Sequence, residues 1–304
     1  MLTHSSFFCL YHCTAVIDYC EQFAKEQNHP VMQYIVFDTA FHKLAPETYT
    51  YAINHKVAEE YGYRKFGFHG LSYQYVMETL ERHGFAGKGE GRPRRIVACH
   101  LGTGGSSAAG IRDGTTVDTT MGWGTLPGLV MSTRCGDIDP SVLIDLVDKG
   151  WTAAQLSKML SGQSGLVGLT DGLTSDLRDV YKVAHTEGHP SRERCELTYN
   201  VYVHRLVGAI GSLMAVMGGI DALVFTDDLG FNMPVLRKSV CDRLAWLGIK
   251  LNDEANMSTT KNAGLLANTD TALISADDSK VKVLTVVNDE EIIIAREVFR
   301  FVDA

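Results

Sequence analysis

The chain has 304 residues, of which 45% are hydrophobic and 21% are charged, as in a globular protein of one large or two ordinary domains. No apolar run reaches the ~18 residues of a membrane span, so we expect no membrane partner. A net charge of −8 without a long basic stretch argues against nucleic acid as a partner. A small anionic ligand would have to be held by a few placed groups.

The N-terminal stretch MLTHSSFFCLYHC has no basic region and no long apolar core, so we expect no signal peptide. The chain has seven cysteines, an odd number, and none forms a C-x-x-C pair. This pattern argues against a disulfide framework or a zinc site. It indicates the reducing environment of the cytoplasm.

The first predicted element is a buried strand that ends at Asp38. It is an apolar run made up of Val31, Tyr34, Ile35, Val36 and Phe37. In α/β proteins ligands bind at the carboxyl ends of strands, so Asp38 is a candidate ligand-binding residue. An aspartate there can equally form a turn or cap a helix, and the local sequence leaves both interpretations open.

A helix and three strands are predicted next. Residues 46–61 are polar with scattered apolar positions and predict the helix, and KGEGRPRR at 88–95 predicts a solvated loop. The strands are RIVACHLG, SSAAGI and TTVDTT, with a hairpin turn at Asp113-Gly114 between the last two. A Gly-rich connection at 121–136 follows, and its length is typical of a functional loop.

Helices and strands alternate in the second half of the chain. Asp139 can cap a helix that begins at Pro140. An apolar stripe at three- and four-residue spacing predicts a long helix that ends at Gly218; it comprises Tyr199, Val203, Leu206, Ile210, Leu213 and Met217. DALVFTDDLG and KVKVLTVV predict two strands. A helix that ends at Gly248 lies between them, and a helix at 289–301 closes the chain.

This order predicts the fold class. Three antiparallel strands followed by alternating helices and strands indicate an α/β mixed sheet with helices on both faces. The same order is typical of a ribonuclease-H-like nucleotide-binding domain.

The segment HLGTGGSS, which begins at His100, is the first candidate phosphate site. Its glycines directly after a strand would let backbone N–H groups approach phosphate oxygens. It is not a P-loop, because no lysine follows the second glycine. A tight strand connection with a structural His100 is the alternative interpretation.

Three further sites carry charged candidates, each with a structural alternative. Arg134 in the Gly-rich loop could stabilise phosphoryl charge, or could pair with a nearby aspartate. Glu290 at the start of the last helix could bind a metal, or could favour the positive helix end. Asp176 and Arg178 suit a helix cap. Together these residues suggest phosphates, magnesium and phosphoryl transfer.

The combination of motifs resembles the acetate kinase family, from about Leu10 to the C-terminus. The matching segments occur in the family's order and spacing: VFDTAFH, RKFGFHGLS, ACHLGTGGSSAA, VDTTMGWGTLPGLVMSTRCGDIDP, SGLVGLTDGLTSDLRD, VFTDDLGFN and NDEEIIIAR. The resemblance implies a two-lobed member of the actin and sugar-kinase superfamily. It also implies transfer of the γ-phosphoryl of ATP to acetate with Mg²⁺, in the cytoplasm, by a homodimer.

The resemblance also implies a role for each matching residue. Asp38 matches the active-site aspartate, and His69, His100 and Arg134 match the groups that stabilise the transition state. The phosphate loop would comprise His100, Leu101, Gly102, Thr103 and Gly104; the adenosine contact Asp176, Leu177 and Arg178; the second nucleotide loop Asp228, Leu229, Gly230, Phe231 and Asn232; and the magnesium ligand Glu290. Because a carboxylate acceptor is ionised at pH 7, no strong base is needed. Asp38 would orient the acceptor or the metal's water shell, while His69, His100, Arg134 and the metal supply positive charge and hydrogen-bond donors.

The chain also departs from the family pattern. The family begins with a strand, a phosphate turn and an acetate-binding arginine that have no counterpart here. We therefore expect residues 1–40, joined by the last helix at about 291–304, to be a remnant of an incomplete N-terminal lobe. Residues 41–290 would form the C-terminal nucleotide-binding and dimerisation lobe. The remnant would expose apolar surface and an unpaired strand edge.

Single residues depart as well. Asp227 and Asp228 stand where the family has glycines, and Phe231 where it has glutamate; a carboxylate there would repel nucleotide phosphates. Thr103 replaces an asparagine and Tyr73 a histidine, and the pattern at 123–127 leaves the choice between acetate and propionate open. Two hypotheses follow: an acetate or propionate kinase completed by further sequence or another chain, or a catalytically impaired remnant that binds nucleotide or dimerises.

Overall fold

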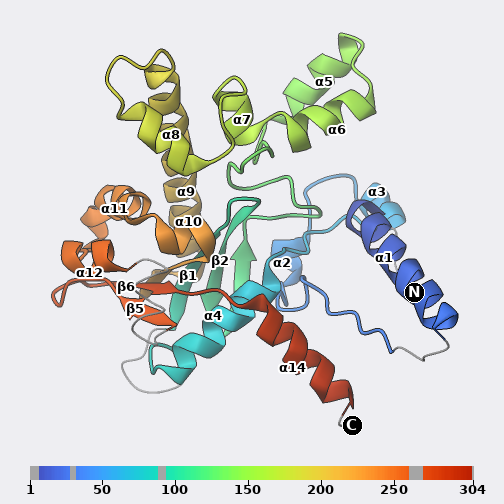
Figure 1. Cartoon of the computed structure of the whole chain (residues 1–304), viewed down its shortest axis with the longest axis horizontal. Coiled ribbons are helices and arrows are strands. Elements are labelled where there is room, and N and C mark those ends of the chain that lie inside the picture. Colours follow the sequence, from blue (N-terminus) through green and yellow to red (C-terminus); the bar gives the residue numbers. More distant parts are fainter. Residues whose placement is uncertain (1–6, 28–31, 88–93, 260–269, 303–304) are drawn as a thin grey trace.

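The computed structural model describes residues 7–27, 32–87, 94–259 and 270–302, and its centre is a six-stranded mixed sheet (Figure 1). The strands lie in the order β3-β2-β1-β4-β6-β5 and are β1 (Arg95–Leu101), β2 (Ser106–Arg112), β3 (Thr115–Thr119), β4 (Ala222–Thr226), β5 (Thr271–Leu273) and β6 (Lys282–Val286). β1, β4 and β6 run parallel, whereas β2, β3 and β5 pair antiparallel with their neighbours. The predicted α/β mixed sheet is confirmed, and β5 is an additional strand that was not predicted.

The turn between β2 and β3 has the geometry that its sequence predicts. Asp113 and Gly114 both adopt positive φ angles, +52° and +80°. Two such residues form the type I′ turn that matches the twist of a two-residue hairpin. The predicted hairpin is therefore confirmed.

Helices cover both faces of the sheet, because successive residues of its central strands point to opposite sides. On one face Val97 and Cys99 pack in a core with α8 (Leu177–Ala184), α9 (Arg192–Met217) and α11 (Pro234–Arg243). On the other face Ile96 and Ala98 pack with α4 (Gly70–Arg82) and α14 (Glu290–Val302), which lie side by side in Figure 1. The remaining helices are α1 (Phe7–Glu26), α2 (Pro46–Tyr49), α3 (His55–Tyr61), α5 (Pro140–Asp148), α6 (Ala153–Gly162), α7 (Gly165–Leu169), α10 (Asp227–Asn232), the 3-10 turn η2 (Ala245–Leu247) and α12 (Asp253–Ser258).

The long helix α9 follows the predicted apolar stripe. All six stripe residues are buried, and the helix ends at Gly218, whose φ is +73°. By length and composition alone α9 could cross a membrane, and 33% of its most apolar window is buried within the chain. Its stripe packs on β1 and β2, where a side chain at Gly110 would lie 3.2 Å from Met217 Sδ. The predicted cap of α5 is also confirmed, because the Asp139 side chain accepts from Ser141 N.

The predicted strand before Asp38 is wrong. Residues 32–37 have no strand partner within the described parts of the chain, and Ile35 and Phe37 are 60% and 55% exposed. An apolar run forms a buried strand only where another strand can satisfy its backbone N–H and C=O groups. Val31 lies outside the described residues.

Three other boundaries differ from the predictions. The predicted helix at 46–61 is two short helices, α2 and α3, because the Asn54 side chain caps a new helix by accepting from Lys56 N and Val57 N. The turn predicted after β4 is the short helix α10, and the predicted helix that ends at Gly248 is divided into α11 and η2. Most of the predicted loop at 88–95 lies outside the described residues.

Candidate active site

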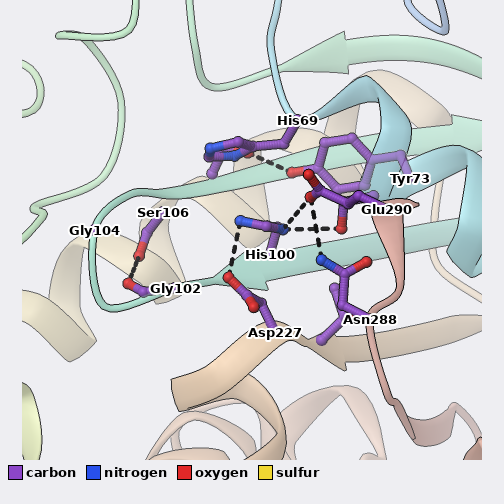
Figure 2. A network of polar contacts seen from close by, with 12 residues as sticks. His69, Tyr73, His100, Gly102, Gly104, Ser106, Asp227, Asn288 and Glu290 are labelled. Atoms are coloured by element: carbon purple, nitrogen blue, oxygen red, sulfur yellow. Dashed lines mark hydrogen bonds and ion pairs between the residues drawn. The ribbon is translucent and has the colours of Figure 1, made fainter. Parts of the chain in front are cut away.

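The carboxyl ends of the three parallel strands converge at one edge of the sheet (Figure 2). His100 lies near the end of β1, Asp227 directly follows β4, and Asn288 and Glu290 follow β6. His100 Nε2 is 3.1 Å from Asp227 Oδ2, and its Nδ1 is 2.8 Å from Ser72 Oγ and 4.0 Å from Glu290 Oε1. The sheet thus brings a buried histidine and two carboxylates together where ligands bind in such folds.

At two glycines of the loop between β1 and β2, a side chain would displace a charged group. A Cβ on Gly102 would lie 2.3 Å from Asp227 Oδ2, and a Cβ on Gly105 would lie 2.4 Å from Arg134 Nη2 and 3.4 Å from His69 Nε2. The loop is closed by a hydrogen bond of 3.0 Å from Gly102 N to Gly105 O. The glycines therefore let one carboxylate and one guanidinium approach the loop backbone.

Arg134 reaches this loop from the long connection after β3. Its Nη2 donates to Gly104 O at 2.9 Å and its Nη1 to Thr125 O at 3.0 Å. The two aspartates that could have paired with it accept from backbone groups, Asp137 from Gly128 N and Asp139 from Ser141 N. Arg134 is therefore held over the predicted phosphate loop, beside the His69 ring.

Asp38 caps helix α4. Its Oδ2 accepts from His69 N at 2.8 Å, its Oδ1 from Leu71 N at 3.4 Å, and its backbone carbonyl from Gly70 N at 2.7 Å. A carboxylate at this end of a helix is also favoured by the helix dipole. The cap interpretation of Asp38 is confirmed, and the cap holds His69 in its left-handed conformation with a φ of +59°.

The His69 ring lies between the loop and His100. The two rings stack with centroids 3.9 Å apart, and His69 Nδ1 is 2.8 Å from Ser107 Oγ. Burial, and then the neighbouring His100 and Arg134, lower the pKa of His69 well below 6.5. A lowered pKa favours the neutral imidazole at pH 7. Of the positive charge and donors expected from this set of groups, His69 is therefore suited to supply a hydrogen bond.

The two predicted nucleotide segments meet at Arg178. Its Nη2 is 2.7 Å from Asp176 Oδ2 and its Nη1 is 3.3 Å from Asp228 Oδ2, while Asn232 Nδ2 donates to Asp228 Oδ1 at 3.0 Å. Asp176 also accepts from Arg178 N, so the helix-cap interpretation is confirmed. The hydrogen bond from Arg178 works against burial and lowers the pKa of Asp176.

Four residues of these two segments lie in the protein interior. Leu177, Leu229, Gly230 and Phe231 are all buried. A fully buried guanidinium, that of Arg237, fixes this region by donating to Gly230 O and Phe231 O and to Asn256 Oδ1 on α12. Burial lowers the pKa of Arg237 to about 10. The members of the two segments that are not buried are the polar ones, Asp176, Arg178, Asp228 and Asn232.

Glu290 has the donor chemistry of a magnesium site. Its Oε1 accepts from Asn288 Nδ2 at 3.1 Å, and the buried Asn288 Oδ1 has no hydrogen-bond partner among the described residues. Carboxylate and amide oxygens are ligands that Mg²⁺ accepts, and it commonly takes one or two from protein while the rest come from water and phosphate. The described residues contain no group of three or more histidine, cysteine, aspartate or glutamate side chains suited to a metal. Glu290 and Asn288 would therefore suit a magnesium ion, to which they would offer a carboxylate and an amide oxygen.

The structure adds Ser72, Ser107 and Asn288 to the site, which sequence reasoning missed. Ser107 pairs directly with His100 in the register between β1 and β2, so the glycine-rich turn that joins these two strands could have located it. Ser72 lies three residues after His69, in the first turn of α4. Asp38, Arg134 and Glu290 are connected through two histidines. His69 donates its backbone N–H to the Asp38 carboxylate and lies beside Arg134. The His69 ring stacks on His100, which in turn contacts Glu290.

Curated proteins with similar sequences are acetate kinases. Those of Clostridium novyi (strain NT) and Fervidobacterium nodosum are 40% and 42% identical over 270 and 266 residues, which cover 88% and 86% of this chain. The chain spans 63% and 61% of the length of these two relatives.

Solved structures agree with the fold. The crystal structure of acetate kinase from Entamoeba histolytica is 41% identical with a TM-score of 0.78, and the match covers 87% of this chain and 65% of that one. A propionate kinase from Francisella tularensis is 29% identical with a TM-score of 0.79, covering 97% of this chain and 73% of that one. The model of the Acetokinase family matches residues 3–296. The chain therefore belongs to the Acetokinase family.

Proposed function

We propose that this chain carries the nucleotide-binding and phosphoryl-transfer part of an acetate kinase-like enzyme, which moves the γ-phosphoryl of ATP to the carboxylate of acetate. The observation that carries the proposal is the convergence of Arg134 Nη2 and His69 Nε2 on Gly105 of the glycine loop. A positive group and a neutral donor there suit the equatorial oxygens of a phosphoryl group in transfer.

Each residue of the site then has a task. Backbone N–H groups of the glycine loop bind the phosphates, Arg134 neutralises developing charge, and His69 donates a hydrogen bond. Mg²⁺, held by Glu290 and Asn288 and shared with the phosphates, would supply further positive charge. No residue needs to remove a proton, since the acceptor carboxylate is ionised at neutral pH.

Asp38 acts in this scheme by holding His69 rather than as a base. Its carboxylate oxygens are occupied by two backbone N–H groups of α4 and its preceding residue. Arg178, Asp176, Asp228 and Asn232 form the polar surface for the nucleotide. Residues 1–40 and 41–290 remain our proposed division into lobes, and a homodimer in the cytoplasm is part of the same proposal.

A second candidate is a catalytically impaired remnant that binds nucleotide. The Asp227 carboxylate favours it, because it lies on Gly102 and pairs with His100 at 3.1 Å, where anionic phosphates would have to approach. Since the chain spans less than two thirds of several relatives, we expect low turnover from it alone. The match to a propionate kinase keeps propionate beside acetate as the acceptor.

Two measurements test the proposal. Calorimetric titration with MgATP should detect binding, and the hydroxamate assay should detect slow acetyl phosphate formation. Arg134→Ala should reduce turnover by on the order of a thousandfold, as expected for a guanidinium that stabilises a phosphoryl group, and leave MgATP binding within a few fold. Arg205→Ala, on the exposed face of α9, is the matched control and should change neither. Binding without turnover would favour the remnant, and absence of binding would refute both.

A further inference from the structure

The side chains of Tyr73, Ser107 and His69 form a hydrogen-bonded chain. Figure 2 shows its two ends, His69 and Tyr73, close together. The Tyr73 hydroxyl is 2.5 Å from Ser107 Oγ, and Ser107 Oγ is 2.8 Å from His69 Nδ1. Tyr73 and Ser107 are both 0% exposed, so water cannot replace either contact. Each hydroxyl proton in this chain must therefore be donated to another of the three groups.

The direction of each hydrogen bond in this chain follows from the partners that each group has. Burial raises the pKa of Tyr73, so its hydroxyl keeps its proton; the hydrogen bond with Ser107, and after it one with the backbone of His100, opposes that shift. The acceptor available to the Tyr73 O–H within the described chain is Ser107 Oγ. A buried O–H without an acceptor is costly, so Tyr73 donates to Ser107. The Ser107 O–H is then left to donate to His69 Nδ1.

The reverse order leaves a proton unsatisfied. If His69 Nδ1–H donated to Ser107, one hydroxyl would lack an acceptor among the hydrogen bonds of the described residues. Either Ser107 would donate to the Tyr73 oxygen and leave the Tyr73 O–H unsatisfied, or Tyr73 would also donate to Ser107 and leave the Ser107 O–H unsatisfied. The forward order satisfies all three groups. In it Nδ1 accepts, and a neutral imidazole must carry its proton on Nε2.

His69 Nε2 faces the loop. The Cβ position of Gly105 is 3.4 Å from this nitrogen and 2.4 Å from Arg134 Nη2. An Nε2–H group there points a donor at the same place as the guanidinium. The other tautomer would present a lone pair to an anionic phosphoryl group and would repel it.

We propose that Ser107 is a positioning residue that holds His69 as the Nε2–H tautomer, which donates to the phosphoryl group beside Arg134. The role toward the phosphoryl group rests on the proposed function, whereas the tautomer does not. Tyr73 donates to Ser107 and orients its hydroxyl in this relay. Neither residue touches the reacting atoms.

Nitrogen-15 NMR of the imidazole groups tests the tautomer in the chain without any ligand, at pH 7.5, with His69→Gln to assign the signal. The expected spectrum shows a protonated Nε2 and an unprotonated Nδ1. Ser107→Ala removes the hydroxyl that donates to Nδ1 and should give a mixture of tautomers, whereas Tyr73→Phe leaves that hydroxyl in place and should keep the Nε2–H tautomer. Tyr75→Phe, on the same helix and also buried, is the matched control and should leave the spectrum unchanged.

The outcomes are distinct. An Nδ1–H tautomer in the unmodified chain, or an unchanged tautomer in Ser107→Ala, would overturn the inference. If Ser107→Ala does not fold, the tautomer of the unmodified chain decides. In the hydroxamate assay Ser107→Ala should lower kcat roughly fivefold to tenfold with KM for ATP unchanged, the effect of weakening one hydrogen bond in the transition state. The expected tautomer in a chain that binds no nucleotide would uphold the relay while the proposed function fails.

Discussion

The phosphate-loop region and the N-terminal region of this chain differ in how their side chains are satisfied. Around the loop, His69, His100 and Arg134 all have polar partners, and the strands beneath are buried. In the N-terminal region Ile35 and Phe37 are 60% and 55% exposed. The outer end of α14 is similar, with Phe299 64% exposed. The comparison teaches that the polar side chains around the loop have partners within the chain, whereas the N-terminal region and the outer end of α14 have apolar side chains that the described residues leave exposed.

Among the variants that test this comparison, the largest change in turnover is expected at Gly105. Gly105→Ala places a Cβ 2.4 Å from Arg134 Nη2, so the guanidinium must leave its position over the loop. We expect turnover to fall on the order of a hundredfold, as when one preorganised donor is removed from an active site.

The neighbouring glycine supplies the control for that experiment. A Cβ on Gly104 meets nothing within 4 Å, so Gly104→Ala should retain turnover within a few fold in the hydroxamate assay. Equal losses in the two variants would contradict the crowding at Gly105.

A gain is expected at Asp227. Asp227→Gly removes a carboxylate that lies against the Gly102 backbone. It also places a glycine at a backbone position whose φ is +65°, a left-handed conformation that glycine adopts without strain. We expect MgATP affinity to rise about tenfold, because a like charge no longer opposes the phosphates. Calorimetric titration measures the change.

Asp113→Gly is the matched control for Asp227→Gly. Asp113 also has a positive φ, +52°, but lies in the hairpin at the far end of β1 and β2. It should leave MgATP affinity unchanged. An unchanged affinity in Asp227→Gly would show that the carboxylate does not oppose the nucleotide.

The stability of the loop region should depend on pH. The pKa of His69 is lowered well below its ordinary 6.5 by burial, so the unfolded state takes up its proton first as pH falls. The stabilisation is complete above pH 6.5 and is lost as pH falls below that value. Denaturant unfolding at several pH values should give a free energy of unfolding that decreases on the acid side. His69→Gln should flatten that slope in part, because the pKa of His42 is lowered as well; an unchanged slope would contradict the neutral state of His69.

The smallest effect is expected in the exposed region. Phe299→Ala removes a ring that is 64% exposed and should change the free energy of unfolding by less than about 0.5 kcal/mol. Ile293→Ala, on the same helix but 0% exposed, should cost roughly 2–5 kcal/mol. Denaturant unfolding of both variants checks this. A large loss in Phe299→Ala would mean that this end of α14 is covered in solution.

Local patterns predicted much of the fold. The hairpin at Asp113-Gly114, the cap at Asp139 and the apolar stripe of α9 are all short-range signals, and all three are confirmed. The strand expected before Asp38 failed because pairing depends on a partner strand, which an apolar run does not specify. β5 escaped prediction because it has only three residues.

The site was predictable only in part, for the same reason. The glycine loop, Arg134 and Glu290 were located through motifs. Ser107 was missed because a single serine carries no periodic signal, and its contacts with His69 and Tyr73 join residues 38 and 34 positions apart. The domain boundary, the dimer and the choice of acceptor stay predictions.

A crystal structure of the chain with MgADP, acetate and orthovanadate tests the central claim most directly. The account predicts the vanadate over Gly105, within hydrogen-bond distance of Arg134 and of His69 Nε2. Vanadate bound on another face, with Arg134 and His69 both turned away from it, would contradict the account.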